Sequence, residues 1–350
     1  MDRLNKLRER IDWLDAQIAS LLNERMMAAD QVGKIKQTED QEVRDPSREM
    51  NVLNQVQMLV QHPTLKANIA NIYQEIMQEA RTAQQFFRHL SQPFRTIGII
   101  GLGLMGGSIC KALKTKDSSI EIATITHLSE DDSLARQGGW IDKEYSTVAD
   151  LAQNCELIIL ATPISKILGL AEEIKRSAQT LTKLVVIDIA SVKQEIAETF
   201  EKLSCDEIDY VPTHPMAGKE KGGFANSQAT LFVNRPWIVV PHKNHRSETL
   251  DHIQELIQFL GSKPISLEAK VHDQQTALVS HIPSILSKSY LDFINSIDPE
   301  SLKISGPGFE SFTRLAYGNA QMRAEICACN HEAIENYLTQ WIEFLKKRPT

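Results

Sequence analysis

A glycine-rich hexapeptide directly after an apolar run constrains the fold of this chain more than any other feature. Gly101-Leu102-Gly103-Leu104-Met105-Gly106 follows the strand-like run TIGII and opens a helical run from Ser108 to Lys114. In that strand–turn–helix order, glycines let the main chain approach a pyrophosphate at a helix N-terminus. The sequence therefore predicts a Rossmann-like domain that binds a dinucleotide, with these six residues in the cofactor site.

Length and charge limit the classes of protein to which the chain can belong. Three hundred and fifty residues correspond to two or three domains, and 38 Lys plus Arg against 45 Asp plus Glu give a net charge of −7. This acidic balance argues against binding to nucleic acid or to an anionic membrane. No apolar run approaches the roughly 18 residues of a membrane span. Because the N-terminus also lacks an apolar signal core, we expect a cytoplasmic protein.

The cysteines predict neither disulfides nor a metal centre. There are five of them, an odd number that does not make a disulfide framework. Cys327 and Cys329 form a C-x-C pair, but no second pair of ligands lies nearby in the sequence. We therefore expect no metal.

The composition and periodicity of the sequence change twice along the chain, which predicts three domains. Residues 1–92 contain one glycine and two prolines and have helical periodicity throughout. From 93 to 267, short β-rich runs alternate with helical stretches and glycine turns, as in a parallel sheet. Residues 268–350 are helical again. We expect a multidomain α and α/β protein with an all-helical domain, a Rossmann-like domain and a C-terminal helical domain.

The first helical domain carries charges where an apolar face is expected. Leucines and isoleucines recur at three- and four-residue steps along a helix predicted to run to about Lys36, and Arg8 and Arg25 lie on or beside that face. Cations near an apolar interior are costly unless an anion neutralises them, so we infer a small dicarboxylate ligand. The two arginines lie about 25 Å apart along a straight helix and cannot both reach one small ligand from the same chain. We therefore expect a homodimer with intertwined N-terminal helices.

Further polar residues extend this set. Asp45 precedes Pro46 and is expected to cap a second helix, and Gln84 lies on the apolar face of a third helix predicted for 64–87. Residues 7–37, LRERIDWLDAQIASLLNERMMAADQVGKIKQ, followed by VRDPSRE, resemble the all-helical chorismate mutases across their length.

That resemblance implies how chorismate is bound. Arg8 of one chain and Arg25 of the other would clamp the two carboxylates. Lys36 and Gln84 would donate to the ether oxygen, whose negative charge grows as its bond breaks. The reaction would be a pericyclic rearrangement, catalysed by holding the substrate folded and by preorganised charge.

The resemblance also implies which residues would surround the ring of chorismate. By the same resemblance, Glu49 would accept a hydrogen bond from the ring hydroxyl, helped by the turn at Asp45, and Arg48 would support the electrostatic field. Many relatives have a serine where this chain has Ala80. Because that hydroxyl contact to a carboxylate is missing, we expect weaker substrate binding.

The second strand of the nucleotide-binding domain ends without the acid that is usual in NAD-binding domains. Such domains place Asp or Glu there for the ribose 2′-hydroxyl, but the run Glu121 to Thr126 is followed by His127, and acids come only at 130–132. No arginine stands there to receive a 2′-phosphate. The acidic loop favours NAD as the cofactor and leaves NADP open. Thr162, at the end of the run CELIILATP, is expected to line the cofactor site.

Two polar segments follow later strand-like runs. Ser191 stands in DIASVK and His214 in VPTHPMAG, both near predicted carboxyl ends of strands, where open α/β sheets bind ligands. With SHIP at 280–283 and FTRLA at 312–316, these segments resemble the prephenate dehydrogenases over about residues 95–350.

The second resemblance implies oxidative decarboxylation of prephenate with a nicotinamide dinucleotide. His214 would accept the ring hydroxyl proton while hydride leaves, a role that suits a neutral imidazole. Ser191 would hold the hydroxyl, His214 and the nicotinamide in register. His281 would be a second histidine of the substrate pocket, and Arg314 would bind the ring carboxylate that leaves as carbon dioxide.

Together the two resemblances predict a bifunctional enzyme of tyrosine biosynthesis, with chorismate and prephenate as substrates and tyrosine as a feedback ligand. Three alternatives stay open. The dehydrogenase could prefer arogenate or NADP, and the helical domain could serve only for regulation or dimerisation. The opening GLGLMG is also that of 3-hydroxyacid dehydrogenases, but HPMAG and FTR have no role in that scheme.

Overall fold

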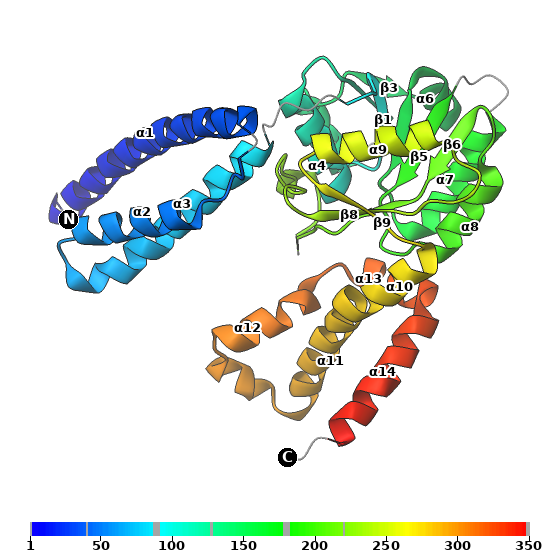
Figure 1. Cartoon of the computed structure of the whole chain (residues 1–350). Helices are drawn as coiled ribbons and strands as arrows, with labels where there is room; N and C mark the ends of the chain where they lie inside the picture. Colours follow the sequence, from blue (N-terminus) through cyan, green and yellow to red (C-terminus); the bar gives the residue numbers. More distant parts are fainter. Residues whose placement is uncertain are drawn as a thin grey trace. The chain divides into compact units, whose positions relative to one another are not determined.

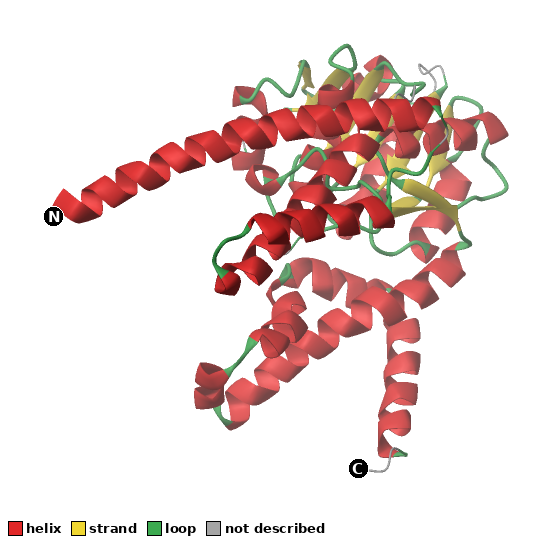
Figure 2. Cartoon of the chain, turned by 60° about the vertical axis from the view of Figure 1, so that its left-hand side comes forward, coloured by secondary structure: helices red, strands yellow, loops and turns green. Residues whose placement is uncertain are grey.

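The computed structural model describes residues 2–39, 41–86, 92–126, 129–177, 183–219 and 221–347. The chain divides into two units, Met1–Leu90 and Ser91–Thr350. The first is helical, and the described strands lie in the second, where Figure 2 shows them in yellow. In the described part, no helix combines the length and apolar character that crossing a membrane requires.

Within its described residues, the first unit consists of three helices and one short 3-10 turn (Figure 1). They are α1 (Asp2–Thr38), α2 (Pro46–Leu59), η1 (Pro63–Leu65) and α3 (Lys66–Phe86). Asp45 caps α2 as predicted, because its Oδ1 accepts a hydrogen bond from the main-chain N–H of Arg48 at 2.9 Å. Pro46 occupies the first turn, where a missing N–H costs nothing.

The helices of this unit bury one side of α3 and leave much of α1 uncovered. α3 packs against both α1 and α2 and buries Ala70, Met77 and Ala80. In contrast, Leu7 and Ile18 on the apolar face of α1 are each more than half exposed. The predicted stripe is therefore present on the helix, but a single chain does not cover it.

The second unit is built on a six-stranded parallel sheet with the order β3-β2-β1-β4-β5-β6. Its strands are β1 (Thr96–Ile100), β2 (Glu121–Ile125), β3 (Lys143–Tyr145), β4 (Leu157–Leu160), β5 (Leu184–Asp188) and β6 (Ile208–Val211). The strand β1 is central, since Ile97 pairs with Ile122 of β2 and with Leu157 of β4. The strand order reverses between β1 and β4, so their carboxyl ends form the crevice in which such sheets bind nucleotides.

Helices connect the strands of this sheet, and one more, α9, comes after its last strand. They are α4 (Leu104–Lys116), α5 (Glu130–Gln137), α6 (Val148–Asn154), α7 (Ile164–Arg176), α8 (Gln194–Leu203) and α9 (Ser247–Phe259). Buried residues of β4, α7 and α8, among them Ile158, Ile167 and Phe200, share one apolar core. This confirms the Rossmann-like domain predicted from the glycine turn.

A second, three-stranded sheet was not predicted. It consists of β7 (Thr213–Pro215), β8 (Pro236–Val239) and β9 (Lys263–Ser266), with β7 antiparallel and β9 parallel to β8. A short 3-10 turn, η3 (Phe224–Asn226), lies between β7 and β8. His214 pairs with Ile238 in this sheet, so a strand rather than a loop fixes its main chain.

The last part of the chain is helical, as predicted. Its elements are α10 (Ala269–Thr276), the π-helical turn η4 (Ala277–His281), α11 (Ile282–Ile297), η5 (Pro299–Ile304), α12 (Pro307–Thr313), η6 (Arg314–Tyr317), α13 (Ala320–Cys329) and α14 (His331–Lys346). Val192, which follows β5, shares a buried cluster with Ala277 and Ile326. These helices therefore pack onto the nucleotide-binding part of the same unit, and the division at 267 stays a prediction.

Candidate active sites

Hydrogen bonds join the helices of the first unit around the predicted polar residues. Gln84 Nε2 on α3 donates to the main-chain oxygen of Ala29 on α1 at 2.6 Å. A Cβ on Gly33 would lie 2.9 Å from Cγ of Gln84, so the absence of a side chain there permits this approach. Lys36 Nζ donates to the main-chain oxygen of Val43 at 2.8 Å, which ties the end of α1 to the segment before α2.

Glu49 has a partner that was not predicted from the sequence. Arg81 on α3 forms an ion pair with its carboxylate, and the two side chains are 28% and 22% exposed. Arg81 stands next to Ala80. The side chain of Arg48 is exposed, although its N–H is held by Asp45. Residues expected to surround one substrate ring thus come from α2 and α3.

Two arginines of α1, Arg8 and Arg25, form no ion pair within the part of the chain that the structure describes. One continuous helix carries both Arg8 and Arg25, which keeps the expected separation of about 25 Å. Arg8 is exposed and Arg25 half-buried, and neither forms an ion pair with any described acid. Their charges are therefore available for an anion.

The glycine turn of the second unit has the geometry that a dinucleotide requires. Gly101 has a φ of +102°, a conformation that favours glycine. A Cβ on Gly106 would lie 2.0 Å from the main-chain oxygen of Gly101, so no side chain fits there. Gly103 is the N-cap of α4, and Leu104 and Met105 begin that helix. The N-terminus of α4 can therefore approach a pyrophosphate closely.

A cavity of about 610 Å³ lies at the carboxyl ends of the strands beside this turn. It is lined by Ile100 of β1, Ile125 of β2 and Thr162, which follows β4. The Oγ1 atom of Thr162 is buried and has no hydrogen-bond partner among the described residues. A buried polar atom of this kind calls for a polar group from a ligand, and the cavity fits the nucleotide predicted from the sequence.

An acid does reach the glycine turn, although not from the end of β2. His127, which stands where an acid is usual, lies outside the described residues. Asp131, in the first turn of α5, would have its Oδ2 3.9 Å from a Cβ on Gly103. Its Oδ1 accepts a hydrogen bond from the N–H of Phe224 at 2.6 Å. The carboxylate therefore lies beside the turn and binds the segment that leads away from His214.

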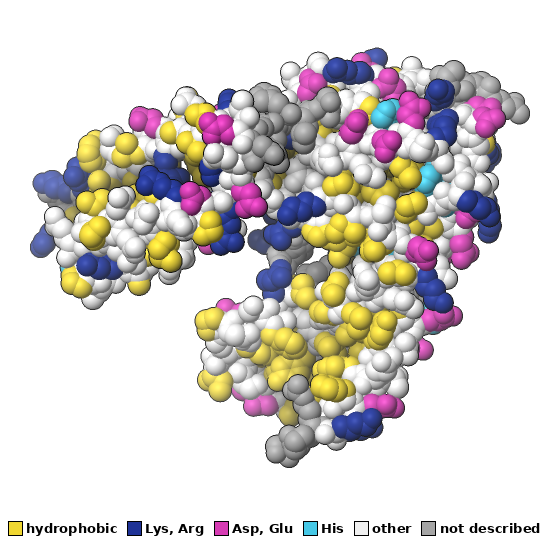
Figure 3. Space-filling view, in the orientation of Figure 1, with side chains coloured by type: hydrophobic (Ala, Val, Ile, Leu, Met, Phe, Trp, Pro, Cys, Tyr) yellow, Lys and Arg dark blue, Asp and Glu magenta, His cyan; other side chains and the backbone are white. Residues whose placement is uncertain are grey.

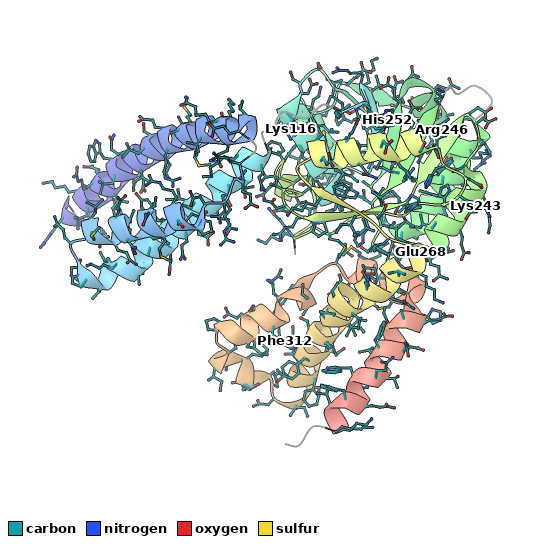
Figure 4. All side chains as sticks on the ribbon, in the orientation of Figure 1. Lys116, Lys243, Arg246, His252, Glu268 and Phe312 are labelled. Atoms are coloured by element: carbon teal, nitrogen blue, oxygen red, sulfur yellow. The ribbon has the colours of Figure 1, made fainter. Side chains whose placement is uncertain are left out.

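Three buried side chains form a hydrogen-bonded chain that begins at His214. Nδ1 of His214 lies 2.8 Å from Nε2 of His272, and Nδ1 of His272 lies 2.7 Å from Oδ1 of Asp273. His272 and Asp273 belong to α10, which begins after Glu268, a residue labelled in Figure 4. Neither residue was predicted from the sequence, although an adjacent His-Asp pair begins eight residues before SHIP.

Asp273 is held by the segment after β5. Its Oδ1 also accepts from the N–H of Lys193 at 2.8 Å, and its Oδ2 accepts from the N–H of Gln194 at 2.9 Å. Lys193 forms a fully buried ion pair with Asp188, the last residue of β5. Burial lowers the pKa of the Lys193 ammonium, while the charges of Asp188 and Asp273 oppose that shift. Lys193 therefore supports the site indirectly, through its contacts with Asp188 and Asp273.

These contacts determine which nitrogen of His214 carries a proton. An ionised Asp273 only accepts, so Nδ1 of His272 is the donor between them. A charged His272 would add a second buried cation beside Lys193, so we assign it as neutral, with Nε2 accepting from Nδ1–H of His214. Nε2 of His214 is then an unprotonated acceptor, as a general base requires.

Burial keeps both site histidines uncharged. The pKa of His214 lies well below its usual value because the ring is buried, with smaller effects from His272, Lys193 and His281. Burial also lowers the pKa of His281 to about 4, against the opposing charge of Asp273.

Ser191 and Arg314 lie on other elements than His214, after β5 and in η6. The main chain of Ser191 faces the ring of His281, and no hydrogen bond of the described part links its side chain to His214. Arg314 begins η6, which packs against α11, and its side chain is exposed. Phe312, labelled in Figure 4, contacts Tyr290 of α11 with ring centroids 5.5 Å apart. The expected roles of Ser191 and Arg314 stay predictions.

Three family models match consecutive parts of the chain. Residues 7–85 match chorismate mutase type II, residues 109–266 match the nucleotide-binding domain of prephenate dehydrogenase, and residues 268–349 match its dimerization domain. A prephenate dehydrogenase from Lactococcus lactis is 32% identical over 251 residues, which cover 69% of this chain and 68% of the relative. The chain belongs to the prephenate dehydrogenase family.

Other comparisons agree with this assignment. A T-protein from Enterobacter agglomerans is 24% identical over 295 residues, covering 82% of this chain and 69% of the relative. A crystal structure of prephenate dehydrogenase from A. aeolicus, in complex with hydroxyphenyl propionate and NAD+, matches with a TM-score of 0.66 and 25% identity. That match covers 73% of this chain and 90% of the other.

Within this family, the chain carries a mutase domain ahead of the dehydrogenase. The predicted combination of an isomerase and an oxidoreductase of tyrosine biosynthesis is confirmed by the two sets of matches. A 3-hydroxyacid dehydrogenase and a purely regulatory helical domain are not favoured. The Rossmann-like domain is a nucleotide-binding domain, as the glycine turn predicted.

Proposed function

We propose that the described residues carry out two consecutive reactions, chorismate to prephenate in the first unit and prephenate to 4-hydroxyphenylpyruvate in the second. The observation that carries the proposal is the buried chain from His214 to Asp273, which leaves Nε2 of His214 as a neutral acceptor. An oxidation of a ring hydroxyl needs such an acceptor next to a nucleotide.

In the dehydrogenase reaction, His214 would accept the hydroxyl proton at Nε2 while that carbon loses hydride. NAD, when bound, supplies the hydride acceptor. The ring carboxylate, held by Arg314, leaves as carbon dioxide, and its bonding electrons make the ring aromatic. Proton, hydride and carbon dioxide are then all accounted for. His272 and Asp273 keep His214 in the required tautomer throughout.

In the mutase reaction, the protein would act by charge and position alone. Arg25 and the Arg8 of a second chain would each bind one carboxylate of chorismate, since both arginines lack an acidic partner in the described part. Lys36 and Gln84 would donate to the ether oxygen as its charge develops. Glu49, held by Arg81, would accept from the ring hydroxyl.

A homodimer with exchanged N-terminal helices would complete the mutase site. The separation of Arg8 and Arg25 along α1 supports it, and so does the exposure of Leu7 and Ile18 on the apolar face of that helix. Figure 3 shows apolar side chains on the surface of the first unit. Burying such a face against a second copy is favourable by about 25 cal/mol for each Å² removed from water.

NAD rather than NADP is the proposed cofactor, because Asp131 places a carboxylate beside Gly103. A negative charge there would bind a ribose hydroxyl and repel a 2′-phosphate. We expect Asp131→Asn to lower the ratio of the NADP to the NAD dissociation constant about tenfold, which corresponds to about 1.4 kcal/mol. The amide oxygen can still accept from Phe224. Calorimetric titration with both nucleotides measures the ratio, and Glu130→Gln is the matched control. A ratio within twofold of wild type would contradict the role of Asp131.

The lowered pKa of His214 predicts an unusual pH profile. A base works when deprotonated, so kcat/KM for prephenate should stay on its plateau below pH 6.5 and fall only at more acidic pH. A histidine with its ordinary pKa of about 6.5 would already be half protonated at that pH. Steady-state rates from pH 5 to 9 test this, and a midpoint at or above pH 6.5 would be inconsistent with a buried, uncharged base.

The experiment that tests the proposed function is an assay of the purified chain with defined substrates. Chorismate alone should be consumed to prephenate, and prephenate with NAD should yield NADH and 4-hydroxyphenylpyruvate. Arogenate with either nucleotide should react more slowly, and tyrosine should inhibit the dehydrogenase. If the chain preferred arogenate to prephenate, or NADP to NAD, the proposed substrate or cofactor would be wrong.

A further inference from the structure

Asn330 is a buried polar residue that connects the C-terminal helices to the dehydrogenase site. It lies between α13 and α14 and is 6% exposed. Its Nδ2 donates to the main-chain oxygen of Asp273 at 2.8 Å and lies 3.1 Å from Nδ1 of His281.

The contact with Asp273 fixes the orientation of the Asn330 amide. A main-chain oxygen only accepts, so the amide must present its NH₂ group and not its oxygen. The second N–H of that group then points to Nδ1 of His281, which must be unprotonated to accept it. Because a neutral imidazole carries one proton, Nε2 of His281 is a donor.

Among the described residues, this donor has no acceptor within hydrogen-bond distance, although the main chain of Ser191 faces the same ring. Nε2 of His281 is buried, and no hydrogen-bond partner exists for it among the described residues. The ring itself is 3% exposed. Buried donors without an acceptor are rare in native structures, so the missing acceptor is expected to come from a ligand.

Burial leaves the ring of His281 neutral at ordinary pH. Burial lowers the pKa of His281 to about 4; Asp273 and the main chain of Ser191 oppose the shift, and His272 adds to it. His281 in turn lowers the pKa of His214 slightly, so the two rings are close enough to interact.

We propose that Asn330 is a positioning residue that keeps Nε2–H of His281 as a hydrogen-bond donor to an acceptor oxygen of the dehydrogenase substrate. The pocket then presents one acceptor, Nε2 of His214, and one donor, Nε2–H of His281. A hydroxyl that loses its proton fits the first, and a carboxylate or keto oxygen fits the second. The inference rests on the proposed dehydrogenase function.

Asn330→Asp tests the donor directly, since it keeps the shape of the side chain and removes its donor. A carboxylate raises the pKa of the adjacent His281. At low pH the charged ring still donates from Nε2. At high pH the neutral ring keeps its one proton on Nδ1, where it donates a hydrogen bond to the carboxylate, and Nε2 becomes an acceptor. We expect KM for prephenate to rise about tenfold from pH 6 to pH 8.5 in this variant, the worth of one hydrogen bond to a charged group. In wild type the change should be less than twofold.

Two further variants separate this effect from loss of structure. Asn330→Leu should raise KM about equally at both pH values, because the tautomer of His281 is then no longer fixed. Asn336→Asp makes the same chemical change on the exposed side of α14 and should leave KM unchanged. An unchanged KM in Asn330→Leu, or an Asn330→Asp effect that is the same at both pH values, would overturn the proposal.

A measurement on the unmodified protein decides the same point even where a variant fails to fold. In histidine-selective ¹⁵N NMR, the two nitrogens of His281, assigned with His281→Asn, should show a proton on Nε2 and none on Nδ1 at pH 7.5. A proton on Nδ1 would refute the inference. This readout needs no substrate, so it stands apart from the proposed function, which fails if wild type does not oxidise prephenate.

Discussion

His214→Asn lowers the dehydrogenase kcat by about 10²–10⁴-fold, the usual contribution of a positioned general base. Asparagine occupies similar space and can still donate to His272, but it has no basic nitrogen to accept the hydroxyl proton. The effect should appear in kcat at saturating prephenate and NAD, measured as NADH formation. The mutase rate of the same preparation should stay within twofold of wild type, because the first unit contains no part of the chain from His214 to Asp273.

His331→Asn is the matched control for this substitution. His331 is exposed at the start of α14, and its ring lies 3.3 Å from the main-chain oxygen of Ala328. It should leave both activities unchanged. If His214→Asn kept a dehydrogenase rate near that of this control, His214 would not be the base.

Arg25→Ala lowers the mutase kcat/KM by about 10²–10³-fold, as removal of one preorganised charge contact does in other enzymes. The reason is that a carboxylate of chorismate would be left without its cation in a half-buried position. Loss of chorismate, followed by ultraviolet absorbance, measures the rate. Lys34→Ala removes an exposed cation of α1 that pairs with Asp30 and should have little effect. Equal damage to the dehydrogenase would contradict separate sites.

Arg8→Ala provides the test of the shared site. Alone, it should be as inactive as Arg25→Ala, although Arg8 lies far along the helix. A mixed dimer of the two variants contains one site that inherits neither change, so the purified mixed dimer should recover about half the wild-type mutase rate. Absence of any recovery would show that the two arginines do not meet across a dimer.

Features with a local cause could be predicted from the sequence. Asp45 caps α2 because its side chain reaches the N–H of a residue three positions later, and the neighbouring proline favours the first turn. Gly101 adopts a positive φ that the strand–turn–helix pattern requires. The first helix, predicted to about Lys36, ends at Thr38.

The polar centre of the dehydrogenase site could not be predicted in the same way. His214 meets His272 across 58 residues and Asn330 meets His281 across 49, so each contact depends on packing between distant elements. The strand β7 that carries His214 has three residues and ends in proline, and such a short segment has no alternating pattern to recognise. Arg81 was missed because its partner Glu49 lies on another helix.

The most direct measurement supplies the wild-type chain with chorismate and NAD and nothing else. The arginines proposed to bind chorismate and the base proposed for the dehydrogenase must then act one after the other, because the product of the first reaction is the substrate of the second. We predict one NADH and one 4-hydroxyphenylpyruvate for each chorismate consumed. Arg25→Ala should slow the formation of both by about 10²–10³-fold, and His214→Asn should leave prephenate to accumulate. Consumption of chorismate without NADH in the wild-type chain, or no consumption at all, would contradict the account.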